Sequence, residues 1–240
     1  MRKILLSFLI LVSTTTLFAQ EVTSNTAKPW AYWWWPGSAV NETDLAANLK
    51  TYADAGFGGM HIIPIYGVKG EEDKFIPYMS DRWLEILDFI TKEAAKNDMG
   101  IDMSLGTGWP FGGSEVSIGH GAKKFVLNAN NELTVSPTGQ KVKRAAPGGE
   151  GLVIDHFSKG AADAYFDLFG KAFKKKNYGV RAFYNDSYEV YGANWTTDFL
   201  QKFKEFRGYD LADHYDVLAL DSATTEKEKR IWADYNQTLH

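Results

Sequence analysis

The chain has 240 residues, of which 45% are hydrophobic, 15% aromatic and 23% charged, and its formal net charge is −4 at pH 7. This mildly acidic balance, without a stripe of lysine and arginine, argues against nucleic-acid binding, which needs cations along the phosphate backbone. The lack of cysteine excludes disulfides, thiolate chemistry and zinc–thiolate sites.

The first 20 residues have the features of an export signal. Arg2 and Lys3 precede an apolar run at residues 4–12, and small or polar residues follow toward Ala19. The apolar run is too short to serve as a permanent membrane anchor. We therefore expect export to a periplasm or the outside. Removal of residues 1–20 changes the net charge from −4 to −6. After this removal we expect no association with a membrane.

Apolar strands and amphipathic helices alternate after a short leader at residues 21–28. Strands are predicted at 31–35, 60–65 and 101–105, with one helix between each pair. Asn41 is the expected N-cap of the first helix and Ser80 that of the second. Near-continuous apolar strands that alternate with helices indicate a parallel sheet covered by helices.

Residues 114–150 break this alternation. Short strand-like runs at 125–127, 132–135 and 141–142 are separated by turn-forming residues, including the pair Asn130-Asn131. This spacing predicts a β-rich insertion of short antiparallel strands.

Strand–helix alternation resumes beyond the insertion. Ser158 is the expected cap of a third helix, a fourth core strand is predicted at 180–184, and Thr196 is the expected cap of the helix after it. A capping box between Thr225 and Glu228 predicts a last helix, which reaches the final residue without a C-cap.

Four strand–helix units are half the number in a (β/α)8 barrel. We therefore predict that residues 29–240 form the N-terminal half of a TIM-like (β/α)8 barrel, with the insertion near 114–150 and truncation at the C-terminal end. An open, doubly wound sheet of four parallel strands is the alternative fold.

Each of the four predicted core strands ends in unusual residues. The segments are WWWPG at 33–37, IPIYG at 63–67, GTGWPFGG at 106–113 and NDSYE at 185–189. Ligand-binding residues of barrel enzymes lie at the C-terminal ends of the strands. We therefore expect these four segments to face one site.

The segment at 182–195, AFYNDSYEVYGANW, is the strongest candidate for chemistry. It holds the carboxylates Asp186 and Glu189 among Tyr188, Tyr191 and Trp195. Carboxylates can transfer protons during glycoside cleavage, and aromatic rings stack on the apolar faces of sugars. The alternative is purely structural, because polar turns after buried strands often carry such residues for capping alone.

Several other features favour carbohydrate over a nucleotide or a metal. Four of the eight tryptophans fall within residues 30–35, although a rigid core could use them equally. The glycine-rich segments at 106–113 and 146–151 lack the dinucleotide and P-loop spacings. His61, within an apolar strand, is expected to be a hydrogen-bonded core residue. Asp102 should either face the barrel mouth or pair with a cation.

Six segments together carry a family resemblance. With them, the chain resembles glycoside hydrolase family 106, the exported bacterial α-L-rhamnosidases: PWAYWWWPG at 29–37, GFGGMHIIPIYGVKG at 56–70, GTGWPFGG at 106–113, KRAAPGGEGLVIDHFS at 143–158, FYNDSYEVYGANWT at 183–196 and DYNQTLH at 234–240. The resemblance implies a longer protein with a (β/α)8 catalytic barrel and β-rich domains. It also implies hydrolysis of terminal rhamnose with inversion, on an oligosaccharide or polysaccharide, with calcium as a possible cofactor.

The resemblance also implies roles for individual residues. Glu189 would be the general acid, with a pKa raised by burial among Tyr188, Tyr191 and Trp195. Asp186 would position the sugar, and the other expected contacts of the sugar are Trp34, Trp109, Asn185 and Tyr188. The base that activates water would come from a later strand, so the 240 residues alone are expected to lack half of the catalytic pair.

Two alternatives remain open at this point. The chain could be a non-catalytic, sugar-binding fragment that uses its aromatic side chains. It could also belong to a glycosidase for another deoxysugar or a uronic acid, because sequence alone does not fix the contacts of the sugar. The sequence contains no contiguous carboxylate loop of the EF-hand type, which would indicate a calcium site.

Overall fold

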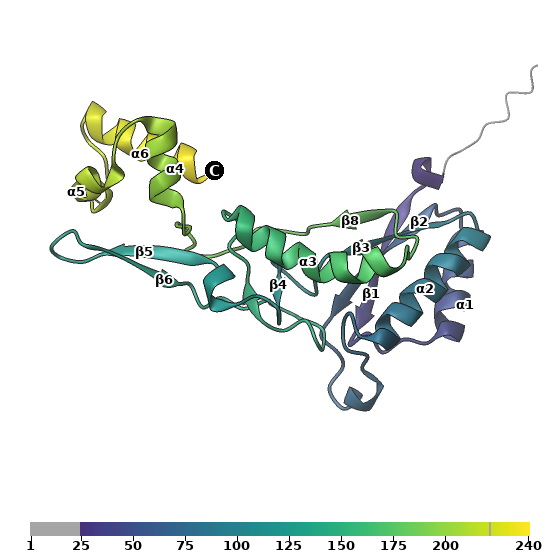
Figure 1. Cartoon of the computed structure of the whole chain (residues 1–240). Coiled ribbons are helices and arrows are strands. Elements are labelled where there is room, and N and C mark those ends of the chain that lie inside the picture. The colour runs from purple at the N-terminus through teal and green to yellow at the C-terminus, as the bar shows by residue number, and fades with distance from the viewer. Residues whose placement is uncertain (1–24, 221) are drawn as a thin grey trace, which may run out of the picture.

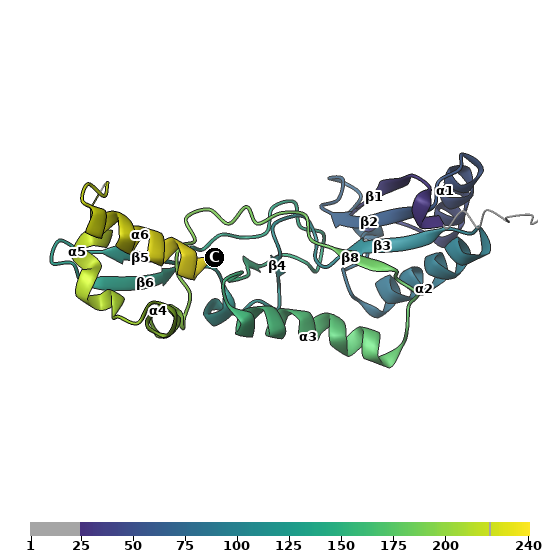
Figure 2. The ribbon, with the colours of Figure 1, turned by 90° about the horizontal axis from the view of Figure 1, so that it is seen from above.

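The computed structural model describes residues 25–220 and 222–240, so the predicted export signal lies outside the described part. The chain is elongated, with a sheet and three helices at one end and a hairpin packed on helices at the other (Figures 1 and 2). No helix of the described residues has the length and apolarity needed to cross a membrane.

A four-stranded parallel sheet forms the larger part. Its strands are β1 (Trp30–Pro36), β2 (Gly59–Ile65), β3 (Gly100–Ser104) and β8 (Ala182–Tyr184), and they lie side by side in the order β1-β2-β3-β8. All three neighbouring pairs are parallel. The mixed α/β fold with a parallel sheet, predicted from the sequence, is confirmed.

Three capped helices cover one face of this sheet (Figure 2). They are α1 (Glu42–Asp54), α2 (Asp81–Lys96) and α3 (Lys159–Lys175). The predicted caps are confirmed, because Asn41, Ser80 and Ser158 each accept a hydrogen bond from the backbone N–H three residues on. Side chains of all three helices share one core with the alternate strand residues Trp33, Trp35, Met60, Ile62, Ile101 and Met103.

The opposite face of the sheet remains half-exposed. Tyr32 and Trp34 alternate with the buried Trp33 and Trp35 along β1, and their side chains are 54% and 47% exposed. A doubly wound sheet would carry helices on both faces and reverse its strand order at a switch point. In the described residues, helices cover only one face of the sheet and the strand order does not reverse. Both observations disfavour the doubly wound sheet.

The predicted insertion is present, with one correction. A hairpin of β5 (Lys123–Leu127) and β6 (Leu133–Pro137) is antiparallel, and β4 (Gly112–Gly113) pairs with β7 (Leu152–Val153). The strand predicted at 141–142 is wrong: Lys141 forms only an isolated bridge with Leu152. This segment is therefore held by isolated contacts with distant residues and not by a regular ladder of strand hydrogen bonds.

A second core fills the other end of the molecule. It contains α4 (Phe199–Arg207), α5 (Tyr215–Leu218) and α6 (Glu226–Leu239), packed against the hairpin side chains Phe125, Leu127 and Leu133. The predicted capping box at the start of α6 is confirmed. Short 3-10 helices occupy Asn25–Ala27, Glu72–Lys74, Ile118–His120 and Leu211–His214.

The predicted cap of α4 is wrong. The helix begins at Phe199 after Asp198, and Asp198 makes no side-chain cap. The Thr196 hydroxyl instead donates to the carboxylate of Asp155, at 2.9 Å. Asp155 is buried and also pairs with Lys123 at 3.2 Å. This buried polar contact joins β5 and the segment after β7 to the start of the second core.

Candidate active site

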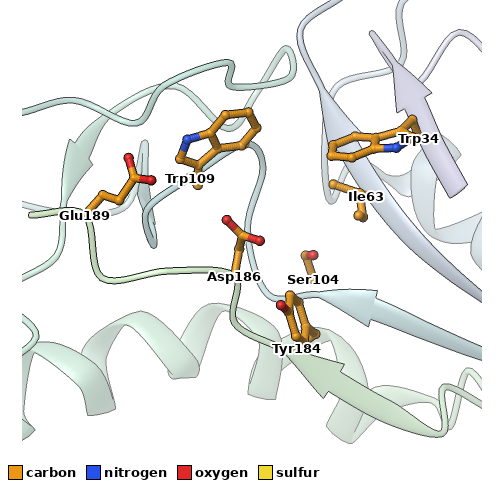
Figure 3. Close-up of a pocket in the computed structure, with 8 residues that line it drawn as sticks. Trp34, Ile63, Ser104, Trp109, Tyr184, Asp186 and Glu189 are labelled. Atoms are coloured by element: carbon orange, nitrogen blue, oxygen red, sulfur yellow. The ribbon is translucent and has the colours of Figure 1, made fainter. Parts of the chain in front are cut away.

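A cavity of about 260 Å³ lies where the parallel strands end. Its walls come from all four strands and the loops after β3 and β8 (Figure 3). The lining residues are Trp34, Ile63, Ser104, Gly108, Trp109, Tyr184, Asp186 and Glu189. The sequence-based expectation that the four strand ends face one site is confirmed.

The floor of the cavity is one layer of the sheet. Trp34 pairs with Ile63 across β1 and β2, and Ser104 pairs with Tyr184 across β3 and β8. Below this layer, the buried His61 contacts the Ser104 hydroxyl at 3.1 Å, and its ring packs edge-on against Tyr184. Burial lowers the pKa of His61. His61 is thus the hydrogen-bonded core residue that we expected.

Asp102 lies one layer down and is paired with a cation. Both carboxylate oxygens accept hydrogen bonds from the Arg181 guanidinium, which also lies over the Trp30 ring, 4.0 Å from its centroid. Of the two alternatives left open for Asp102, the structure shows the pairing with a cation, and Asp102 does not line the cavity at the strand ends.

The Trp109 wall depends on a tight crossing of two loops. Trp109 and Lys143 exchange backbone hydrogen bonds of 3.1 and 2.8 Å. Gly108 has a φ of +55°, and a Cβ on it would lie 1.9 Å from the carbonyl oxygen of Lys143. Only glycine allows this approach, so Gly108 fixes where the indole of Trp109 lies.

Glu189 lies in the cavity as an anion rather than as a buried acid. Lys143 Nζ lies 3.0 Å from its Oε2, and the Tyr191 hydroxyl donates to the same oxygen at 3.3 Å. The hydrogen bond from Lys143 lowers the pKa of Glu189. The expected raised pKa is therefore wrong for this structure. Tyr188 and Tyr191 are largely exposed, and Trp195 is buried in the second core instead.

Gln140 fixes the backbone around Glu189. Its side-chain amide donates to the carbonyl of Glu189 at 2.6 Å and accepts from the N–H of Tyr191 at 2.7 Å. The insertion thus holds the loop after β8 through both Gln140 and Lys143.

The second carboxylate of the cavity is less constrained. Asp186 is exposed to the cavity, and no described cation lies within ion-pair distance of it. Its side chain points toward the space between Trp109 and Tyr184 (Figure 3). An unpaired carboxylate at that position is available to accept hydrogen bonds from sugar hydroxyls.

The predicted site residues divide into two groups. Trp34, Trp109, Asp186 and Glu189 meet in the cavity, whereas Asn185 and Tyr188 do not line it. The Asn185 side-chain oxygen is buried without a hydrogen-bond partner. The Tyr188 ring instead packs against His156, with 5.6 Å between the ring centroids.

Neither Ser104 nor Lys143 was expected at the site from the sequence, whereas Ile63, Gly108 and Tyr184 lie within segments that were. Ser104 could have been found from strand alternation, which places it on the face of β3 opposite the core residue Met103. Lys143 offered no comparable signal, because a lysine in a polar insertion is most often a solvated charge.

A calcium site does not fit the described residues. No group of three or more His, Asp or Glu side chains among them could hold a metal ion, and calcium requires six to eight oxygen ligands. Calcium therefore enters no step proposed below.

A family model, a curated protein and a solved structure are similar to this chain. Residues 21–132 and 131–240 match the family model described as alpha-L-rhamnosidase. A curated protein of Formosa agariphila named "Putative beta-glucuronidase" is 37% identical over 112 residues, which cover 43% of this chain and 10% of that protein. A rhamnosidase structure from Novosphingobium sp. PP1Y has a TM-score of 0.71 at 14% identity, covering 90% of this chain and 44% of that one.

The likeness to the solved rhamnosidase shows a shared fold. The chain spans about a tenth of the length of the curated relative and less than half of the solved structure.

Proposed function

The chain belongs to the alpha-L-rhamnosidase family, glycoside hydrolase family 106, and we propose that it forms part of the catalytic domain of an enzyme that hydrolyses terminal α-L-rhamnosides. The observation that carries this proposal is the cavity at the strand ends, where Asp186 and Glu189 lie beside Trp34 and Trp109. Carboxylates for proton transfer and indole rings for stacking are what a glycoside-cleaving site needs.

Each of the four residues has a proposed role. Trp34 and Trp109 stack on the apolar faces of the sugar, and Asp186 accepts hydrogen bonds from its hydroxyls. Glu189 donates the proton to the leaving oxygen. In the structure Lys143 holds Glu189 ionised, so proton donation requires the substrate to separate this pair as it fills the cavity.

We also propose that the sheet is half of a (β/α)8 barrel. Its sequential strand order, its single helix-covered face and the location of the cavity at the C-terminal strand ends support this proposal. In an inverting enzyme, a second carboxylate activates water from the opposite face of the sugar, about 6.5–9.5 Å from the acid. We propose that this base comes from a later strand of the complete barrel. From the signal-like residues 1–20 we also propose that the protein is exported.

A uronic acid is the second candidate for the cleaved sugar. The Formosa agariphila relative is named as a glucuronidase, and the cavity lies beside two cationic residues, Lys143 and Arg144. The cleaved sugar of such an enzyme would carry a carboxylate where rhamnose has a methyl group.

Matched aryl glycosides separate these candidates. The enzyme that contains this chain is given an aryl α-L-rhamnoside and the β-D-glucuronide of the same aryl group, and release of the aryl alcohol is followed. We expect the rhamnoside to react at least about a hundredfold faster, because Asp186 and Glu189, which line the cavity, would repel the carboxylate of a glucuronide. The reverse order would favour the glucuronidase, and rhamnose binding without turnover would favour a sugar-binding module.

A further inference from the structure

Arg144 lies between two aromatic rings at the edge of the cavity. Its guanidinium carbon is 5.3 Å from the ring centroid of Tyr66 and 5.6 Å from that of Trp109. Its Nη1 donates a 2.7 Å hydrogen bond to the Tyr66 hydroxyl. Trp109 also lines the cavity, so the guanidinium borders the sugar site through this ring.

The backbone of Arg144 is held in an unfavourable conformation. Its φ of +55° lies in the left-handed region, which costs a residue with a Cβ about 1–2 kcal/mol. Its carbonyl accepts a 2.9 Å hydrogen bond from the N–H of Tyr66, and Gly108 packs directly against it. Strained backbone of this kind gathers at ligand-binding sites. The surrounding loops therefore fix the backbone from which the Arg144 side chain extends.

The charge of Arg144 is not neutralised within the described residues. No carboxylate of residues 25–220 or 222–240 lies within ion-pair distance of it, whereas its neighbour Lys143 is paired with Glu189. A guanidinium has five N–H donors in a planar fork that matches carboxylate and sulfate oxygens. Within the described residues the guanidinium donates one hydrogen bond, to Tyr66, which leaves the remaining donors for a ligand.

We propose that Arg144 binds an anionic substituent, a carboxylate or a sulfate, on the sugar unit next to the one that is cleaved. The inference rests on the proposed rhamnoside site and specifies its substrate class: a terminal rhamnose attached to an acidic sugar. Tyr66 and Trp109 orient the guanidinium, and the bound anion replaces the water that now solvates its free donors.

Binding of disaccharides to this chain tests the proposal by titration calorimetry at low salt. The probes are L-rhamnose linked to D-glucuronic acid, the same disaccharide with D-glucose in its place, and the glucose form carrying a 6-sulfate. We expect the glucuronic acid form to bind on the order of tenfold tighter than the neutral form, as one charge-assisted hydrogen-bonded pair provides. The sulfated form separates recognition of a carboxylate from recognition of sulfate.

Variants assign the preference to Arg144. Arg144→Gln should bring the acidic and neutral forms to equal affinity. The matched control is Lys141→Gln, which removes an exposed cation from the same segment and should leave the tenfold preference intact. Added salt should reduce the preference in the wild-type chain.

The outcomes distinguish this inference from the proposed function. Binding of the neutral form without any preference for an anion would overturn the anionic subsite and leave the rhamnoside site standing. A preference that persists in Arg144→Gln would also overturn it. An Arg144-dependent preference, together with equal affinity when L-mannose replaces L-rhamnose, would support the subsite and contradict the rhamnoside function. Binding of neither form would contradict both.

Discussion

Replacement of Glu189 by glutamine is expected to slow hydrolysis of a rhamnosyl disaccharide by about 10²–10⁴-fold in the enzyme that contains this chain. A sugar alkoxide is a poor leaving group and needs a proton as the glycosidic bond breaks, and glutamine cannot supply one. An aryl rhamnoside with a strongly acidic phenol needs no such proton, so its turnover should fall much less. Steady-state kinetics on both substrates measures the contrast.

Two further variants make this result specific. Glu205→Gln removes a carboxylate that pairs with Lys202 on α4, outside the cavity, and should leave both rates unchanged. Lys143→Met removes the cation that lowers the pKa of Glu189. The pKa should then rise, and the decline of kcat/KM at alkaline pH should move to higher pH, because Glu189 stays protonated longer. If Glu189 acted as a base, the acidic limb would move instead, which would contradict the donor role.

Replacement of Asp155 by alanine is expected to lower the free energy of unfolding by about 3–5 kcal/mol, the cost of removing one partner from a buried ion pair. The Asp155 side chain is 1% exposed and that of Lys123 is 12% exposed. Alanine would leave the Lys123 ammonium buried without its carboxylate, and it would also remove the acceptor of the Thr196 hydroxyl. Urea denaturation followed by circular dichroism measures the change.

Asp163→Ala is the matched control for this prediction. Asp163 also pairs with a lysine, Lys159, but the two side chains are 62% and 87% exposed. Exposed pairs contribute little to stability, so the control should unfold at nearly the same urea concentration as the wild type. Equal effects of the two substitutions would contradict a stabilising role for the buried pair.

Local features of the fold were predictable from the sequence. Asn41, Ser80 and Ser158 cap their helices as expected, because the hydrogen bond of a cap joins residues only three apart. The parallel strands followed from their apolar runs. The error at Thr196 arose because its partner, Asp155, lies 41 positions earlier in the chain, where no local pattern reports it.

The candidate site was also predictable in part, because local patterns in the sequence locate the strands and their ends. Trp34 lies near the end of β1, and Trp109, Asp186 and Glu189 follow β3 and β8, so the topology of a parallel sheet brings them together. The charge state of Glu189 depends on Lys143, which is 46 positions away in the insertion, and the position of Trp195 depends on the second core. Such contacts form only when distant segments pack.

The central claim is that the cavity at the strand ends binds L-rhamnose between Trp34 and Trp109. NMR of the indole N–H groups of this chain, assigned with Trp→Phe variants and titrated with L-rhamnose, tests it most directly. We predict that the signals of Trp34 and Trp109 shift in a saturable way, while those of Trp83, buried and hydrogen-bonded to Ser38, and of Trp195, buried in the second core, stay in place. Unmoved Trp34 and Trp109 signals at saturating sugar would contradict the claim.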